Sequence, residues 1–349
     1  MARVFVAMSG GVDSSVAAAL LVRDGHEVVG VTMQLWPSTD AEGGCCSETA
    51  ARDAHRTCDV LGIPHYTLNF REDFRRAVVD PFCDDYAAGR TPNPCIVCND
   101  VVKFEELWRR VALQGADNLA TGHYARIERD AAGTPWLVRG LDAAKDQSYF
   151  LYRMTAAQLD RTLFPVGGMR KADVRAVAAE SGLPTAEKAE SQEVCFVPGD
   201  DRFAFVGAAR PTSAQPGAIV DRAGRVLGRH RGIAGYTVGQ RKGLGVAAER
   251  PLYVLEVRAE DNVIVAGPAE ELSVTEVICG DVVWRGGAWA EVAAQVRYRQ
   301  GALPAIARVH GDRLALTFRE PLAGVAPGQA AVCYNGEVVL GGGVVEEAR

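Results

Sequence analysis

Three short segments of this chain carry side chains whose types and spacing suit chemistry. Residues Ala7–Ser15 read Ala-Met-Ser-Gly-Gly-Val-Asp-Ser-Ser and follow a short apolar run near the N-terminus. Cys95 and Cys98 form a Cys-x-x-Cys pair behind two prolines, and Cys195 lies in the polar segment Glu190–Phe196. The first segment predicts an anion-binding loop, and the other two predict thiol chemistry.

The glycine-rich segment has the features of a phosphate-binding loop. Adjacent glycines before small hydroxyl residues leave backbone N–H groups and a positive helix end available for an anion. No Gly-Lys-Ser/Thr sequence follows, which excludes the kinase and GTPase kind of loop. The pattern Ser-Gly-Gly-x-Asp-Ser resembles the loop of ATP pyrophosphatases, which adenylate a substrate and release pyrophosphate. An ordinary strand–turn–helix corner is the alternative, and the position behind the first strand disfavours it.

The cysteines lie in segments where a thiol can react. The prolines before Cys98 predict an extended loop, with a helix beginning near Asn99, and a cysteine at a helix N-terminus has a lowered pKa. A single Cys-x-x-Cys also fits a redox pair or half of a zinc site, but no second pair with zinc-site spacing follows. Cys195 has polar and charged neighbours, unlike a buried structural cysteine. Two such cysteines in an adenylating enzyme indicate sulfur transfer, in which one carries a persulfide and the other attacks or resolves it.

Composition and charge limit the class of protein. A chain of 349 residues favours two or three domains, and the absence of a leader or a long apolar run predicts a soluble, cytoplasmic protein without a membrane partner. Nine cysteines in a chain of this size do not indicate a secreted disulfide framework. The net charge is −6, yet residues 209–248 concentrate basic side chains against the single acid Asp221. This segment suits a phosphate backbone, although a solvated face is the alternative. The basic residues are Arg210, Arg222, Arg225, Arg229, Arg231, Arg241 and Lys242.

Alternating strand and helix patterns predict a doubly wound, Rossmann-like α/β domain at the N-terminus, and the resemblance of its loop to that of ATP pyrophosphatases implies the adenine nucleotide alpha hydrolase type. Strands are expected at Arg3–Ala7, Glu27–Met33, His65–Asn69 and Asn118–Thr121, and helices at Asp13–Arg23, Ser47–Leu61, Asp73–Tyr86, Asn99–Leu113 and Lys171–Glu180. In a parallel sheet, ligands bind at the carboxyl ends of the strands. Ser9, Met33 and Gly122 are therefore expected to lie together.

The pattern changes near Pro211, after which short strands replace helices. Strands are expected at Gly217–Asp221, Arg225–Gly228, Leu252–Val257 and Val263–Ala266. From Ser273 onward, alternating runs predict a small antiparallel β-barrel. We expect three domains: a catalytic ATP-pyrophosphatase domain at 1–208, a basic β-rich middle domain at 209–272 and a C-terminal β-barrel at 273–349.

Seven motifs together resemble the bacterial tRNA-specific 2-thiouridylases, a family of ATP pyrophosphatases, over nearly the whole chain. They are Ala7–Ser15, Thr91–Asn99, Thr121–Tyr124, Lys145–Ser148, Ser191–Phe196, Tyr236–Gly243 and Val296–Arg299. The resemblance implies ATP-dependent 2-thiolation of the wobble uridine, U34, in the tRNAs for lysine, glutamate and glutamine. It also implies ATP and Mg²⁺ as cofactors, and a persulfide donor, either a cysteine desulfurase or a sulfur-relay protein, as a partner.

Specific roles follow from the resemblance. ATP contacts are implied for Ala7, Met8, Ser9, Gly10, Gly11, Val12, Asp13, Ser14, Met33 and Gly122, with Asp13 also helping to hold magnesium. Cys195 would carry the persulfide and Cys98 would be the second catalytic thiol. Either the persulfide attacks C2 of the uridine directly or released hydrosulfide does so. Contacts with tRNA are implied for Asn93, Pro94 and Cys95 at the target base, and for Lys145, Asp146, Gln147, Arg297 and Tyr298 elsewhere.

One residue departs from the family pattern. Cys95 stands where many members have aspartate, which puts a third thiol beside the catalytic pair. Cys95, Cys98 and Cys195 could therefore hold an iron–sulfur cluster, and this is an alternative to the persulfide reaction. Two further alternatives are another ATP-dependent synthetase, which would not need the cysteines, and a non-catalytic RNA-binding module.

The remaining cysteines and one histidine are given structural roles. Cys58, Cys279 and Cys333 fall on predicted helices or strands, where a thiol packs as a small hydrophobe. Cys45 and Cys46 lie in a glycine-rich segment and are expected either to be structural or to shape the pocket. His123 is expected to position a loop and not to act as a catalytic base.

Overall fold

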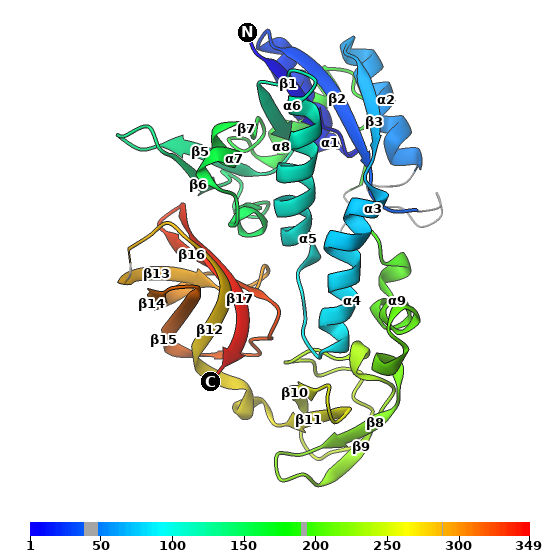
Figure 1. The fold of residues 1–349 in the computed structure, drawn as a ribbon, viewed down its shortest axis with the longest axis vertical. Helices are drawn as coiled ribbons and strands as arrows, with labels where there is room; N and C mark the ends of the chain where they lie inside the picture. The colour runs from blue at the N-terminus through cyan, green and yellow to red at the C-terminus, as the bar shows by residue number, and fades with distance from the viewer. Residues whose placement is uncertain (38–47, 190–193, 288) are drawn as a thin grey trace. The chain divides into compact units, whose positions relative to one another are not determined.

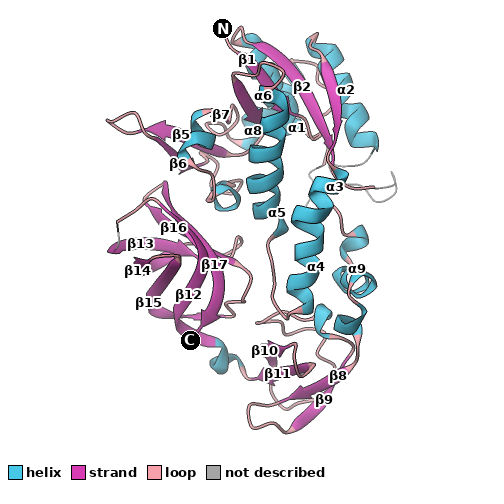
Figure 2. Ribbon diagram, in the orientation of Figure 1, coloured by secondary structure: helices cyan, strands magenta, loops and turns pink. Residues whose placement is uncertain are grey.

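The computed structural model describes residues 1–37, 48–189, 194–287 and 289–349 (Figures 1 and 2). The chain divides into two compact units, each assembled from separate segments. The first unit contains Met1–Val79, Cys95–Gly199 and Glu337–Val339; the second contains Asp80–Pro94, Asp200–Gly336 and Leu340–Arg349. Among the described residues, no helix combines the length and the apolar character needed to cross a bilayer.

A five-stranded parallel sheet lies at the centre of the first unit, in the order β3-β2-β1-β4-β7. Its strands are β1 (Arg3–Ala7), β2 (Glu27–Gln34), β3 (His65–Asn69), β4 (Asn118–Thr121) and β7 (Thr162–Leu163). The first four agree with the predicted strands to within one residue. Val4 and Val6 of β1 are fully buried, as expected for a sheet covered on both faces. The predicted doubly wound α/β fold is confirmed.

Helices α1 (Val12–Arg23), α2 (Glu48–Leu61) and α8 (Lys171–Glu180) pack around this sheet. Ala17 and Ala18 of α1 are fully buried, and their small side chains let the helix lie close to its neighbours. The helix ends where predicted, because Gly25 adopts a positive φ of 81° that favours glycine. The predicted N-cap of α2, Ser47, lies outside the described residues.

Two longer helical runs each contain a stretch of π-helix. One comprises α3 (Arg71–Phe74), the π-helical η1 (Arg75–Val79) and α4 (Asp80–Ala87). The other comprises α5 (Pro94–Val97), the π-helical η2 (Cys98–Leu107) and α6 (Trp108–Ala112). The predicted start of the second run near Asn99 is wrong. It begins at Pro94, because proline is well suited to the first position of a helix, where no backbone N–H bond is required.

A hairpin of β5 (Ala125–Arg129) and β6 (Pro135–Arg139) was not expected from the sequence. Its turn is held by the Asp130 carboxylate, which accepts hydrogen bonds from the backbone N–H groups of Ala132 and Thr134, both at 2.9 Å. The first unit also contains α7 (Ala156–Asp160). Short 3-10 helices lie at Ser148–Leu151, Pro198–Asp200, Pro211–Ala214, Ile233–Gly235 and Ala269–Leu272.

The second unit is mainly β-structure. Helix α9 (Arg202–Ala209) precedes a four-stranded sheet in the order β10-β11-β8-β9. Its strands are β8 (Gly217–Val220), β9 (Val226–His230), β10 (Tyr253–Arg258) and β11 (Val263–Gly267). All four strands were expected at these places, with ends shifted by up to two residues.

Six strands then close into an antiparallel barrel, since β12 pairs with both β15 and β17. They are β12 (Ser273–Trp284), β13 (Trp289–Gln295), β14 (Leu303–His310), β15 (Arg313–Ala323), β16 (Ala330–Asn335) and β17 (Val338–Ala348). Alternate side chains, such as Leu314, Leu316 and Phe318 of β15, fill its core. The predicted C-terminal barrel is confirmed.

Candidate active site

The glycine-rich loop lies at the carboxyl end of β1 and runs directly into α1. Gly10 has a positive φ of 68°, and a Cβ added there would lie 2.1 Å from the carbonyl oxygen of Ala50. The hydroxyl of Ser14 donates to the Gly11 carbonyl at 3.1 Å and accepts from the Ser9 N–H at 3.2 Å. The first N–H groups of α1 have no partners within the helix, so they can bind an anion. The loop therefore fits the phosphates of ATP.

The residues expected beside this loop lie near it. Strands β1 and β4 are in register from Val4 to Ala7, and Gly122 follows the end of β4. A Cβ on Gly122 would lie 2.5 Å from the backbone nitrogen of Ser14. Met8 is bound to the strand that carries Met33, because its N–H donates to the Val31 carbonyl at 2.8 Å. The end of β4 thus places Gly122 against the loop. Strand β2, which carries Met33, runs beside the start of the loop.

A lysine that the sequence did not single out pairs with the carboxylate of the loop. The Nζ atom of Lys171, at the start of α8, lies 2.7 and 2.9 Å from the two carboxylate oxygens of Asp13. The hydroxyl of Tyr124 donates to the same carboxylate at 2.7 Å. Both oxygens of Asp13 are therefore engaged by protein donors.

This arrangement does not fit the magnesium role expected for Asp13. Its carboxylate is neutralised by Lys171, and both of its oxygens accept bonds from protein donors, so neither oxygen is available to a metal ion in this structure. We therefore assign no step to a metal ion bound by these residues.

Cys98 does not occupy the first turn of a helix, as the sequence suggested. The residue before it, Val97, already has helical φ and ψ angles, and Cys98 opens the π-helical stretch η2. Cys98 is buried, whereas Cys95, one turn earlier, is exposed. The predicted position of Cys98 at a helix N-terminus is thus wrong. The π-helix is a different feature of interest, because such segments occur often at functional sites.

The π-helical stretch η2, which begins at Cys98, is anchored within the same unit. Asp100 accepts a bond from the Nε atom of Arg153 at 2.6 Å. The side-chain amide of Asn99 donates to the Phe150 carbonyl at 3.1 Å, and Lys103 donates to the Asn99 side-chain oxygen at 2.9 Å. These bonds fix the orientation of the helix next to its buried thiol.

Cys195 belongs to the same compact unit as Cys98 and is half-buried. The following residue, Phe196, is buried and fixes the backbone beside it. Its ring contacts Phe74 edge-on, with centroids 5.5 Å apart, and Trp36 at 6.3 Å. Residues 190–193 of this motif lie outside the described residues. The iron–sulfur alternative gains no support, since Cys95, Cys98 and Cys195 are not gathered into a metal-binding group in the described structure.

The other cysteines have the structural roles expected of them. Cys58 is fully buried against Gly30, and burial raises the pKa of its thiol to about 12. Burial likewise raises the pKa of Cys279 to about 12, and it raises the pKa of Cys333 further. A neutral buried thiol is unreactive. Cys45 and Cys46 lie outside the described residues.

The surroundings of His123 favour its neutral form. Desolvation, with a smaller contribution from the positive charge of Lys103, holds the pKa of His123 well below its usual value. Its Nδ1 atom lies 2.7 Å from the Thr121 hydroxyl. The side chain therefore positions the segment after β4, as expected.

Two of the three residues expected to contact tRNA at 145–147 bind the protein itself. The Asp146 carboxylate accepts bonds from the Gly140 and Ser148 N–H groups, both at 3.0 Å, and from Arg139 at 2.8 Å. The Gln147 side-chain oxygen accepts from the N–H of Tyr124 at 3.0 Å. These two residues shape the loop, which leaves Lys145 as its cationic side chain.

The remaining residues expected at the tRNA lie in both units. Asn93 and Pro94 belong to the second unit, and the exposed Cys95 to the first. In the second unit, Arg297 is half-buried and Tyr298 is 37% exposed. Gln295 donates to the backbone carbonyls of both Arg297 and Tyr298, at 3.1 and 2.8 Å, and so holds their turn.

The basic segment 209–248 is partly neutralised within its own unit. Arg210 pairs with Asp84, Arg222 with Glu271 and Arg225 with Asp221, while Arg231 lies over the ring of Phe203. Arg229, Arg241 and Lys242 are exposed, and in the described part of the chain their side chains make no ion pair. These three residues are exposed cations of the segment without an acidic partner in the described chain.

We expect Gly122→Ala to weaken ATP binding about tenfold, because the new methyl group must displace the backbone at Asp13 and Ser14. Isothermal titration with ATP measures the effect. Gly168→Ala is the matched control, since a Cβ at that position meets no atom within 4 Å. Equal ATP affinity in the two variants would show that Gly122 does not shape the nucleotide site.

Comparison with known proteins covers the whole chain. Residues 2–199 match a family model described as the tRNA methyl transferase HUP domain, residues 204–268 its PRC-barrel domain, and residues 274–345 an aminomethyltransferase beta-barrel domain. A tRNA-specific 2-thiouridylase MnmA from Geobacter metallireducens is 50% identical over 99% of this chain and 97% of its own length. A protein of the same name from Heliobacterium modesticaldum is 49% identical over 98% of this chain and 92% of its own length. Another, from Carboxydothermus hydrogenoformans, is 48% identical over 99% of this chain and 98% of its own length. The chain therefore belongs to the tRNA-specific 2-thiouridylase family.

Proposed function

We propose that this protein catalyses the ATP-dependent 2-thiolation of U34 in the tRNAs for lysine, glutamate and glutamine. The observation that carries the proposal is that one compact unit holds both a loop suited to phosphates and the two cysteines of the sequence motifs, the buried Cys98 and the half-buried Cys195. The loop would bind the ATP that activates an oxygen, and the cysteines can deliver sulfur. Relatives named tRNA-specific 2-thiouridylase align along nearly the whole chain.

The reaction needs an activated oxygen before sulfur can enter. The C2 oxygen of the uridine attacks the α-phosphate of ATP, pyrophosphate leaves, and the oxygen becomes part of a good leaving group. The loop from Ala7 to Ser14 binds the phosphates through backbone N–H groups. Gly122 packs against the loop, and Met33 lies on the neighbouring strand.

Sulfur then replaces the activated oxygen. The terminal sulfur of a persulfide on Cys195 attacks C2 and AMP departs with the former C2 oxygen. The Cys98 thiolate attacks the Sγ atom of Cys195, the persulfide S–S bond breaks, and its electron pair goes to the sulfur on C2. The products are 2-thiouridine and a Cys98–Cys195 disulfide, which a thiol reductant must reduce with two electrons. If Cys98 attacks first, hydrosulfide is released and itself attacks C2, with the same overall balance.

A persulfide on Cys195 must come from a sulfur donor, which we propose to be a cysteine desulfurase or a sulfur-relay protein. The tRNA would be held by Asn93, Pro94 and Cys95 at the target base, by Lys145, and by Arg297 and Tyr298 in the barrel. We propose a three-domain division for these tasks, with a catalytic domain at 1–208, a middle domain at 209–272 and a barrel at 273–349.

The experiment that tests this function measures pyrophosphate release. We expect release to require both ATP and a tRNA transcript with U34, and to fall to background with the same transcript carrying C34. A small-molecule synthetase would release pyrophosphate without RNA, and a binding module would release none. Either result would contradict the proposal, and iron with sulfide in anaerobically purified protein would favour the cluster-dependent reaction over the persulfide route.

A further inference from the structure

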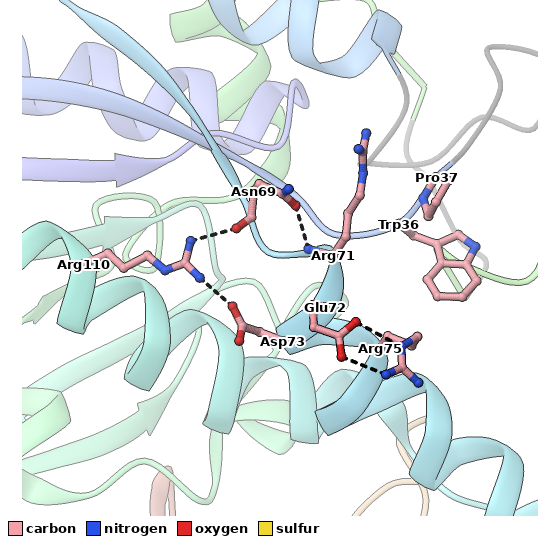
Figure 3. A pocket seen from close by; sticks show the side chains of 8 residues that line it. All are labelled: Trp36, Pro37, Asn69, Arg71, Glu72, Asp73, Arg75 and Arg110. Atoms are coloured by element: carbon pink, nitrogen blue, oxygen red, sulfur yellow. Dashed lines mark hydrogen bonds and ion pairs between the residues drawn. The ribbon is translucent and has the colours of Figure 1, made fainter.

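A pocket of about 450 Å³ lies at the carboxyl ends of β2 and β3, on the same edge of the sheet as the glycine-rich loop (Figure 3). Its volume is within the range of sites that bind small ligands. None of the roles assigned above uses it. Its lining residues are Trp36, Pro37, Asn69, Arg71, Glu72, Asp73, Arg75 and Arg110.

Two of the three arginines in this pocket are committed to neighbouring groups. Arg110 donates to the Asn69 carbonyl at 2.7 Å, pairs with Asp73 at 2.5 Å and stacks over the ring of Phe70. Arg75 pairs with Glu72 at 2.8 Å. These contacts neutralise both acidic residues of the pocket and hold its floor in place.

Arg71 is the cation that remains available. Its backbone N–H is bound by the side chain of Asn69, but its exposed guanidinium makes no hydrogen bond or ion pair within the described chain. Figure 3 shows this side chain extended away from the carboxylates of Glu72 and Asp73. An unneutralised guanidinium at the mouth of a pocket can form two parallel bonds to a phosphate.

An aromatic wall links the pocket to the cysteine that carries sulfur. Trp36 is half-buried, and its ring meets that of Phe196 with centroids 6.3 Å apart. Phe196 also contacts Phe74, which follows the pocket residue Asp73 in α3. Cys195 therefore lies one residue away from a side chain that supports the wall of the pocket.

An indole ring beside a free guanidinium is the combination that proteins use to hold a nucleotide, since the base stacks on the ring and the phosphate pairs with the cation. We propose that this pocket binds one nucleotide of the RNA substrate, close in sequence to the uridine that receives sulfur, with its phosphate on Arg71 and its base against Trp36. The inference rests on the proposed function. The pocket would hold the RNA beside Phe196, the neighbour of Cys195 in the chain.

The test compares tRNA affinity in the full-length variants Arg71→Gln and Arg109→Gln. We expect Arg71→Gln to weaken binding about fivefold and to reduce the slope of log affinity against log salt by about one, because one phosphate contact is lost. Arg109→Gln is the matched control, as its guanidinium pairs with Glu106 and does not line the pocket, and we expect less than a twofold change. Equal affinity and slope in Arg71→Gln and the wild-type protein would overturn the inference.

The base contact has its own measurement. Stacking on Trp36 is expected to quench tryptophan fluorescence when tRNA is added, and Trp36→Phe is expected to lose that part of the quenching while it keeps an aromatic contact for Phe196. Quenching at Trp36 by AMP but not by tRNA would identify a free-nucleotide site and overturn the inference. Slower sulfur uptake from a donor protein, with unchanged tRNA affinity, would also overturn it and indicate a protein-docking site.

Failure of this inference is distinguishable from failure of the proposed function. If the wild-type protein does not release pyrophosphate in the presence of tRNA, the function itself is wrong. If it does, and Arg71→Gln and Trp36→Phe bind tRNA as the wild type does, only the role of the pocket is wrong. Thermal unfolding of each variant checks that the fold is retained.

Discussion

Cys195→Ser and Cys98→Ser are each expected to reduce tRNA thiolation by at least about a thousandfold while leaving ATP affinity unchanged. A hydroxyl at position 195 cannot accept a persulfide sulfur, and a hydroxyl at position 98 cannot break the S–S bond that holds it. Neither side chain belongs to the glycine-rich loop, so nucleotide binding is expected to persist. Nucleoside mass spectrometry of the tRNA, with ATP titration of the same samples, measures both effects.

The matched control is Cys95→Asp. Cys95 is exposed one turn before Cys98, and aspartate is the residue that many family members are expected to carry there. The persulfide reaction predicts that Cys95→Asp retains thiolation, because neither proposed sulfur step uses this thiol. A cluster held by three thiolates predicts loss of activity in all three variants. Full thiolation by Cys98→Ser or Cys195→Ser would contradict both mechanisms.

The parallel sheet and its loop could be predicted because local pattern and tertiary structure agree there. Val4 and Val6 are apolar in a strand buried on both faces, and Gly10 needs its positive φ whatever surrounds it. The barrel strands were also predictable, since alternation along a strand such as β15 directly reflects its inner and outer faces.

The surroundings of Cys98 could not be predicted by the same reasoning. The two prolines in Thr91–Cys95 indicated an extended loop, but Pro94 begins the helix instead of preceding it. Proline is compatible with both positions, and only the packing of the following helix decides between them. The π-helical stretch after Val97 has no sequence signature of its own.

The residues that were missed make their contacts across long stretches of sequence. Lys171 and Asp13 are 158 positions apart, and a lysine at the start of a helix gives no sign of its partner. The pocket residue Trp36 meets Phe196 from a different part of the chain. Arg71 and Arg75 have similar sequence contexts, and only the ion pair to Glu72 distinguishes them. Such roles depend on the fold and become visible only with it.

The Lys171–Asp13 pair links the ATP loop to a segment expected at the tRNA. The backbone N–H of Lys171 donates to the Asp142 carboxylate at 3.0 Å, and the Asp142 carbonyl accepts from the N–H of Lys145 at 2.9 Å. Tyr124, whose hydroxyl donates to Asp13, is bound by Gln147 at two points. The Tyr124 N–H donates to the side-chain oxygen of Gln147, and the Tyr124 carbonyl accepts from the N–H of Gln147. If RNA displaces residues 145–147, we therefore expect the hydrogen bonds of Lys171 and Tyr124 to the Asp13 carboxylate to change.

Lys171→Met is accordingly expected to weaken ATP binding about tenfold and to lower tRNA-dependent pyrophosphate release more strongly, by about a hundredfold. Without the ammonium group, the Asp13 carboxylate places an uncompensated negative charge in a loop that must hold phosphates. Lys171→Arg retains the charge and is expected to recover part of the ATP affinity. The double variant Asp13→Asn, Lys171→Met removes both charges, so its ATP affinity should exceed that of Lys171→Met alone. Arg129→Met, which breaks the exposed pair with Asp160 in the same unit, controls for a general loss of an ion pair. If Lys171→Met binds ATP as tightly as the Arg129→Met control, the pair is structural and the charge of Asp13 does not govern the nucleotide site.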